Sequence, residues 1–76
     1  MMNTPRTWLA DLRKHQKLTQ AQLADRLKIS RTYYADLERG EKEGRYDVAK
    51  RIAEYFHVPI TWVFEGPQGE KVVGRE

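Results

Sequence analysis

Five closely spaced polar side chains give this chain of 76 residues its clearest chemical capacity: Arg31, Thr32, Tyr33, Asp36 and Arg39. An arginine donates hydrogen bonds in a fork that matches paired acceptors such as O6 and N7 of guanine, and it also binds phosphate. Threonine and tyrosine add hydroxyl groups and apolar surface, and an aspartate can accept from an amino group such as N4 of cytosine. The combination is suited to recognising a polar surface.

Other kinds of chemistry find little support elsewhere in the chain. There is no cysteine, and the two histidines, His15 and His57, lack a ligand-like spacing, so neither a disulfide nor a metal site is expected. The sequence contains no nucleophile–base pair and no glycine-rich phosphate loop, which argues against an enzyme. We therefore expect no catalytic residue, no metal and no cofactor.

The charge of the chain favours an anionic partner. The net charge is +3 at pH 7, and it is concentrated in the first 40 residues, where eight Lys or Arg stand against four Asp or Glu. Nucleic acid is the first candidate for such a basic half, although an ordinary solvated surface would explain the charge alone equally well. No apolar run approaches the roughly 18 residues of a membrane span, and the N-terminus lacks a signal peptide, so a soluble cytoplasmic protein is expected.

Capping residues divide the first part of the chain into three short helices. Thr4-Pro5 is a typical helix start and predicts a first helix that runs to about His15. Thr19 and Gln22 have the spacing of a capping box, which predicts a second helix over about 20–27. Ser30 as N-cap and Gly40 as stop predict the third helix over about 31–39, which carries the five polar side chains.

The second part of the chain is predicted to hold two more helices and a tail. Apolar residues at helical spacing predict an amphipathic helix of about three turns, on a face made of Tyr46, Ala49, Ile52, Ala53 and Phe56. Val58-Pro59 interrupts it, and residues 60–64 could form one closing turn. Residues 65–76 are rich in glycine, and we expect them to form a flexible C-terminal tail.

The helices predicted over 20–27 and 31–39 are joined by only three residues, which is the plan of a helix-turn-helix. In that plan the first helix crosses the phosphate backbone of DNA, and the second lies in the major groove with its first residues at the base edges. The apolar positions brace the two helices against each other: Leu23, Ala24, Leu27, Ile29, Tyr34 and Leu37. With Tyr34 facing inward, steps of about 100° place Thr32, Asp36 and Arg39 outward and Arg31 and Tyr33 on the flanks.

The stretch LTQAQLADRLKISRTYYADLERG, residues 18–40, resembles the helix-turn-helix of the XRE family, the Cro and lambda-repressor-like group of bacterial and phage transcriptional regulators. LADLR at 9–13 and IAEYFHVPI at 52–60 fit the same family, so the resemblance covers about residues 6–64. It implies an all-α fold, a compact bundle of five short helices with a central helix-turn-helix. The predicted domains are a DNA-binding domain over 1–64 and the tail over 65–76.

The resemblance also implies roles for single residues. Arg31, Thr32, Tyr33 and Asp36 match positions of the recognition helix that reach bases, and Gln20 matches a glutamine that contacts a phosphate. The plainer alternatives are a phosphate contact for Arg31, a solvated or packed position for Thr32 and Tyr33, an orienting role for Asp36, and helix propensity for Gln20.

Further roles concern the helix ends and the basic surface. In the resemblance, Arg13 and Glu38 match a pair that bridges the first helix to the end of the third. The remaining phosphate candidates are basic: Lys17, Lys28, Arg39, Lys42 and Arg45. The family's chain runs along the DNA backbone after the recognition helix, which favours Lys42 and Arg45.

The sequence departs from the family's pattern at two turns and in one loop. Lys28 and His57 stand where members often have glycine, and a positive φ at either position would cost roughly a kcal/mol. Residues 43–45 replace an Asn-Pro or Pro-Ser pair before the fourth helix, which leaves the path of that loop open.

The aromatic residues near the end suggest an interface. At least one large side chain of residues 60–64 is expected to stay exposed, and exposed aromatics often mark contacts between proteins. We expect a homodimer through this region and the outer face of the fourth helix, at Val48, Tyr55, Trp62 and Phe64. The alternative is a monomer in which Trp62 packs on Trp8.

The sequence thus predicts a sequence-specific regulator that binds double-stranded DNA. As a repressor, it would bind a palindromic operator as a homodimer, with half-sites about one helical turn apart. The alternative is an antitoxin or protein-interaction module whose tail, residues 65–76, binds a partner protein. No small-molecule ligand and no membrane are expected as partners.

Overall fold

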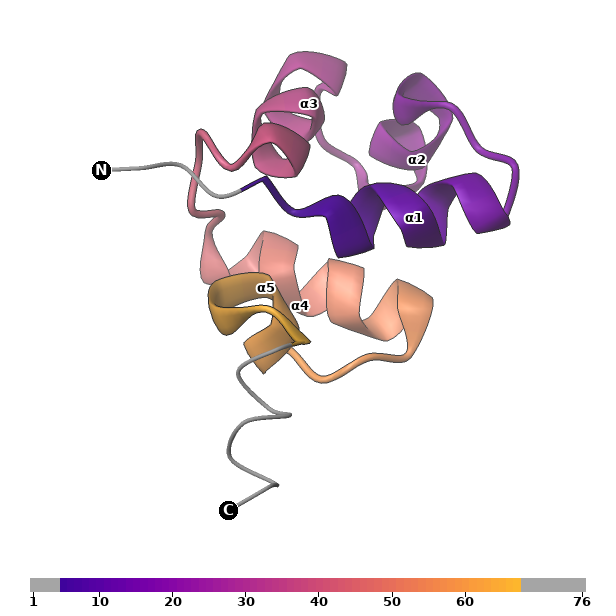
Figure 1. The fold of residues 1–76 in the computed structure, drawn as a ribbon. Coiled ribbons are helices and arrows are strands. Elements are labelled where there is room, and N and C mark those ends of the chain that lie inside the picture. Colours follow the sequence, from indigo (N-terminus) through magenta and orange to yellow (C-terminus); the bar gives the residue numbers. More distant parts are fainter. Residues whose placement is uncertain (1–4, 68–76) are drawn as a thin grey trace. The chain divides into compact units, whose positions relative to one another are not determined.

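The computed structural model describes residues 5–67, and this part of the chain is all-helical and contains no strand (Figure 1). Its helices are α1 (Thr7–His15), α2 (Gln20–Leu27), α3 (Arg31–Arg39), α4 (Tyr46–Phe56) and α5 (Thr61–Glu65). The predicted all-α class with five short helices is confirmed. None of the helices in the described range is long and apolar enough to cross a membrane. The predicted tail lies, from residue 68 on, outside the described residues.

The chain forms two compact units, one ending at Glu43 and one beginning at Gly44. In the first unit, α3 packs against both α1 and α2. Its large apolar side chains are buried: Leu9, Leu18, Leu23, Leu27, Tyr34 and Leu37. Removing each such side chain from water stabilises the fold by about 1.5–3 kcal/mol. Ala24 is buried as well, and Ile29 is half-buried.

Local hydrogen bonds set the bounds of α2 and α3. Oγ1 of Thr19 accepts from the amide of Gln22 at 3.0 Å, and Oε1 of Gln22 accepts from the amide of Thr19 at 2.9 Å. Oγ of Ser30 accepts from the amide of Tyr33 at 3.0 Å, and Gly40 ends α3 with a φ of 80°. The predicted ranges 20–27 and 31–39 are therefore confirmed together with their caps.

The predicted start of the first helix is wrong. Pro5 is not helical, Thr4 lies outside the described residues, and Arg6 is the N-cap with a ψ of 72°. The amide of Arg6 donates to the carbonyl of Glu38 at 2.8 Å. This bond holds the chain in a non-helical direction before α1, so a contact with α3 decides where the first helix begins.

Three non-glycine residues in the described range adopt the left-handed conformation: Lys17, Lys28 and His57, with φ near 60°. The positive φ that the departures from the family's pattern left open at Lys28 and His57 occurs at both positions, and Lys17 adopts one without any sign in the sequence. After each of them the next amide reaches back five residues, from Leu18 to Arg13, from Ile29 to Ala24 and from Val58 to Ala53, at 3.0–3.2 Å. These bonds satisfy carbonyls at the helix ends and offset the strain of roughly a kcal/mol at each position.

In the second unit, α4 packs against α5, and its inward face differs from the predicted one. Val48 is fully buried, so its predicted place on an outer dimer face is wrong, and Tyr46 is 66% exposed although it was expected on the apolar face. Helix geometry explains both, because Val48 lies about 40° and Tyr46 about 120° from Ile52 around the axis.

The closing segment leaves one large aromatic exposed, as expected. Val63 of α5 is buried and Phe64 is 49% exposed, while Trp62 is half-buried. On α4, the half-buried Tyr55 meets Phe56 edge-on, with ring centroids 5.0 Å apart. Trp62, Phe64 and Tyr55 therefore keep some surface for an interface, whereas Val48 does not.

Candidate nucleic-acid interface

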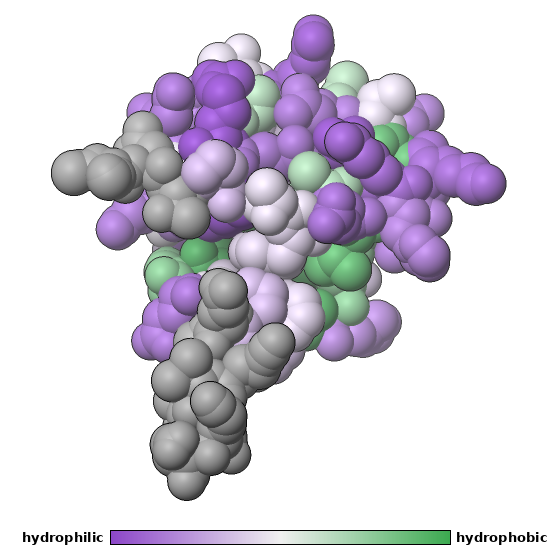
Figure 2. Space-filling model, viewed as in Figure 1, coloured by the Kyte–Doolittle hydropathy of each residue, from purple (hydrophilic) through white to green (hydrophobic). Residues whose placement is uncertain are grey.

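The first turn of α3 presents the polar side chains that the sequence singled out. Arg31 and Thr32 are exposed, Tyr33 is half-buried and Tyr34 is fully buried. On the face in view, most side chains over the region of α2 and α3 are hydrophilic, with a few apolar ones among them (Figure 2). The outward surface of α3 is therefore polar from its first residue, while the side chain that packs inward comes from the second of the two adjacent tyrosines.

Asp36 on the same helix is engaged by its neighbour. Nη2 of Arg39 donates to Oδ1 of Asp36, and Nε of Arg39 lies 3.6 Å from a carboxylate oxygen of Glu41. The aspartate side chain is only 18% exposed, whereas that of Arg39 is 55% exposed. Arg39 thus offsets a negative charge on a surface that would face a phosphate backbone, in keeping with an orienting role for Asp36.

The basic phosphate candidates divide between the two units. Lys17, Lys28 and Lys42 are exposed residues of the unit that contains α3. Arg45 belongs to the other unit, where its Nε lies 3.4 Å from Asp47. Lys17 and Lys28 sit in the left-handed turns that end α1 and begin the connection to α3, so their backbones are fixed by the turn hydrogen bonds.

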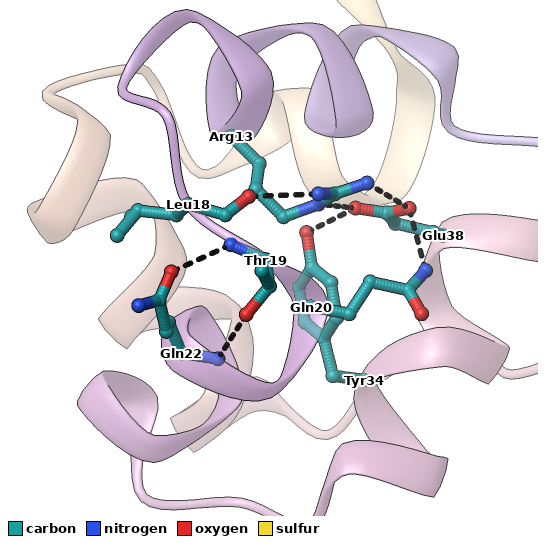
Figure 3. A network of polar contacts seen from close by, with 7 residues as sticks. All are labelled: Arg13, Leu18, Thr19, Gln20, Gln22, Tyr34 and Glu38. Carbon is teal, nitrogen blue, oxygen red and sulfur yellow. Dashed lines mark hydrogen bonds and ion pairs between the residues drawn. The ribbon is translucent and has the colours of Figure 1, made fainter.

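A buried carboxylate lies beneath this surface and joins three helices (Figure 3). Glu38 of α3 accepts from Nε of Arg13 at 2.7 Å and from its Nη2 at 3.3 Å. It also accepts from the hydroxyl of Tyr34 at 2.5 Å and from Nε2 of Gln20, the first residue of α2, at 3.0 Å. Arg13 in turn donates to the carbonyl of Leu18 at 2.8 Å. The network fixes α1 and the start of α2 to α3.

The protonation states follow from these contacts. Burial by itself raises the pKa of the Glu38 carboxyl, but the hydrogen bonds from Arg13, Tyr34 and Gln20 outweigh it and leave the pKa lowered. The hydrogen bond to Glu38 raises the pKa of Arg13, against the effect of burial. Burial and the neighbouring carboxylate raise the pKa of Tyr34. Glu38 is thus ionised, Arg13 charged and Tyr34 neutral around neutral pH.

Gln20 has a more complex setting than the sequence suggested. Its half-buried side-chain amide donates one hydrogen to Glu38, and the amide nitrogen carries a second hydrogen. The first bond holds the side chain at the N-terminus of α2, where backbone N–H groups favour an anion. Sequence reasoning had placed Glu38 only with Arg13 and had missed the hydrogen bonds from Tyr34 and Gln20.

Arg6 makes contacts that sequence reasoning missed. Its Nη1 donates to the carbonyls of Leu37 at 2.7 Å and Lys42 at 2.9 Å, and its Nη2 donates to the carbonyl of Glu43 at 3.1 Å. Burial lowers the pKa of Arg6, while Glu43 and Tyr33 oppose that shift. Its partners lie 31–37 residues away and are backbone atoms, so no pattern near Arg6 could have indicated them.

Comparisons with known proteins agree with this geometry. A protein-family model described as helix-turn-helix matches residues 9–63, which include the whole of α2, α3 and α4. The chain is also similar to a curated Bacillus subtilis (strain 168) protein, the uncharacterized HTH-type transcriptional regulator YqaE, with 36% identity over 68 residues. The match takes in 90% of this chain and 59% of that relative, so the chain spans little more than half of the relative's length.

Proposed function

Because the chain belongs to the XRE-type helix-turn-helix family, we propose that it acts as a sequence-specific regulator of transcription that binds double-stranded DNA. The observation that carries the proposal is the arrangement of α3. Its inward residues, Tyr34, Leu37 and Glu38, are buried and bonded to α1 and α2, while Arg31 and Thr32 at its start are exposed. A recognition helix needs such a rigid base with free side chains above it.

We assign base contacts to Arg31, Thr32 and Tyr33 in the first turn of α3, and a mixed role to Asp36, which would accept from a base while it orients Arg39. Arg31 is suited to the paired acceptors of guanine, and Thr32 to a thymine methyl or a polar base edge. The phosphate contacts are assigned to side chains around this helix: Gln20, Lys17, Lys28, Arg39, Lys42 and Arg45. These contacts position the protein on the duplex, and the base contacts supply the sequence preference.

The proposal also includes a dimeric repressor in the cytoplasm. The exposed Phe64 and the half-buried Trp62 and Tyr55 supply an aromatic surface on the second unit, and Val48 is no longer part of it. A homodimer would bind a palindromic operator with half-sites about one helical turn apart, and it would repress by excluding polymerase. Exposed aromatic side chains are enriched at protein interfaces, which supports a role for this surface.

Selection of bound sequences from a random pool of DNA duplexes tests the regulator function. The wild type should enrich a motif with two related half-sites at moderate salt. The Arg31→Ala variant should lose the preference at one base pair of each half-site, with a cost of about 1–3 kcal/mol against the wild-type motif. Thr32→Ala should relax a neighbouring position.

The matched control is Lys28→Ala, a phosphate candidate. It should weaken all sequences alike and reduce the log–log salt slope by about 0.9. If the wild type enriches no motif, the regulator function is wrong. If Arg31→Ala behaves like Lys28→Ala, then Arg31 contacts phosphate and the base-reading role is wrong.

A further inference from the structure

Arg6 connects the start of the chain to the end of the recognition helix and to the loop that follows it. Its backbone amide donates to the backbone carbonyl of Glu38 at 2.8 Å. Its guanidinium donates to the backbone carbonyl of Leu37, in the last turn of α3, at 2.7 Å. The same guanidinium donates to the carbonyls of Lys42 and Glu43, at 2.9 and 3.1 Å. All of these residues belong to the first unit.

The contacts supply what the end of α3 lacks. The last four carbonyls of a helix have no partner within the helix, and the helix dipole places partial negative charge there. Gly40 and Glu41 satisfy Leu37 and Asp36 through their amides, at 3.2 and 2.9 Å. Arg6 adds a second donor to the carbonyl of Leu37, and its amide donates to the carbonyl of Glu38. Its guanidinium also brings a positive charge to this end of the helix.

The loop is thereby fixed on both sides of Lys42. The amide of Glu41 is bonded to α3 before it, and the carbonyls of Lys42 and Glu43 are bonded to Arg6 after it. The guanidinium reaches the three carbonyls with two nitrogens held in a planar fork, whereas a lysine would have to reach them from a single nitrogen. The side chain of Lys42 is therefore exposed, while the backbone that carries it is held in place.

We propose that Arg6 is a positioning residue for DNA binding, which fixes residues 40–43 against the end of α3 and so holds Lys42 in place for a phosphate. This inference rests on the proposed function. Arg6 itself acts through the loop and not by touching DNA. A fixed loop brings Lys42 to the backbone without the entropy cost of ordering it on binding.

The test measures the salt dependence of affinity for the duplex that the wild type selects, first in the four proteins of a double-mutant cycle and then in two further variants. These are the wild type, Arg6→Ala, Lys42→Ala and the double variant, with urea unfolding to correct for the folded fraction. Arg6→Lys is the charge-matched variant, and Lys14→Ala, an exposed lysine of α1, is the control for the loss of one charge.

A positioning role predicts that Arg6→Ala and Lys42→Ala each lower the log–log slope by about 0.9, and that the double variant loses no more than Lys42→Ala alone. Arg6→Lys should resemble Arg6→Ala, because the fork is lost although the charge remains. Losses that add up to about 1.8 in the double variant would show that Arg6 contacts phosphate itself. An unchanged slope in Arg6→Ala would show that Arg6 has only a structural role. Additive losses and an unchanged slope would each overturn the proposal.

Hydrogen exchange of the DNA-free protein separates this proposal from the regulator function. Arg6→Ala should speed exchange at the amides of Gly40 and Glu41 and leave that of Leu23 in α2 unchanged relative to global unfolding. If those two amides keep their wild-type protection, Arg6 does not hold residues 40–43 against α3. If they lose it and the wild type still selects no duplex, Arg6 does hold this loop, while the regulator function and the positioning role in DNA binding are both wrong.

Discussion

The carboxylate of Glu38 accepts hydrogen bonds from an arginine, a tyrosine and a glutamine, each on a different turn or helix. Glu38 and Arg13 are both about nine-tenths buried. Burial of two charges is costly, so the pair is favourable only because its remaining lone pairs and protons also find partners. Among the described residues, no buried side-chain polar atom lacks a hydrogen bond.

The lowered pKa of Glu38 predicts a loss of stability in acid. A carboxyl whose folded pKa lies below its ordinary value of 4.5 contributes stability that is present above pH 4.5. The contribution is lost as the pH falls from there through the folded pKa. The free energy of unfolding in urea should therefore fall more steeply below pH 4.5 in the wild type than in Glu38→Gln.

Glu38→Gln should also be less stable at neutral pH, by about 3–5 kcal/mol, because it leaves Arg13 buried without a counter-charge. If that variant does not fold, Tyr34→Phe serves instead: it removes one donor, costs about 1–3 kcal/mol and raises the pKa of Glu38. Glu54→Gln, an exposed glutamate of α4, is the control. A pH profile that is equally steep in wild type and Glu38→Gln would contradict the assigned role.

At the scale of helices and turns, local signals explain most of the structure. Thr19 with Gln22, and Ser30 with Gly40, fixed the bounds of α2 and α3, because caps act within four residues along the chain. The start of α1 could not be predicted in this way, since the partner of Arg6 is 32 residues away. The wrong predictions for Tyr46 and Val48 could have been avoided, because the spacing to Ile52 already favoured Val48 as the inward residue.

Because His57 lies in a left-handed turn, replacement by glycine should affect stability differently there than at a helical position of α4. His57→Gly should leave the free energy of unfolding unchanged or raise it by up to about 1 kcal/mol, because relief of strain at a φ of 59° exceeds the added entropy of the unfolded chain. Lys50 is exposed to solvent and lies in the middle of α4, so Lys50→Gly should lower the free energy of unfolding by about 1 kcal/mol. Urea unfolding measures both, and a loss of stability in His57→Gly would show that the turn is not strained.

At the scale of the whole molecule, the sequence predicted the fold class and the surface of α3 better than the surroundings of the site. Arg31 and Thr32 are exposed where a period of 3.6 residues placed them, and Tyr34 is buried. The orientation of Gln20 and the role of Arg6 depend on side chains from other helices, so no count along one helix could reveal them. The assigned contacts with DNA themselves stay predictions.

The proposed dimer predicts that association depends on Phe64. Sedimentation of the wild type should show a monomer–dimer equilibrium that shifts with concentration, and Phe64→Ser should shift it towards the monomer by at least tenfold in dissociation constant, or about 1.4 kcal/mol. Tyr46→Ser is the matched control, since Tyr46 is an even more exposed aromatic of the second unit, outside the proposed interface. Equal effects of the two variants would place the interface elsewhere, and a wild type that stays monomeric would remove the dimer from the proposal.

The buried network beneath α3 has a consequence for how such a protein can change. Tyr34, Leu37 and Glu38 hold the helix, and Arg31 and Thr32 take no part in that hold among the described hydrogen bonds. Under the proposed function, the tasks of folding and of reading DNA fall on different sides of one helix. Arg31 and Thr32 can be replaced without disturbing the fold, so the chain is a scaffold on which a different preference for DNA sequence could be installed.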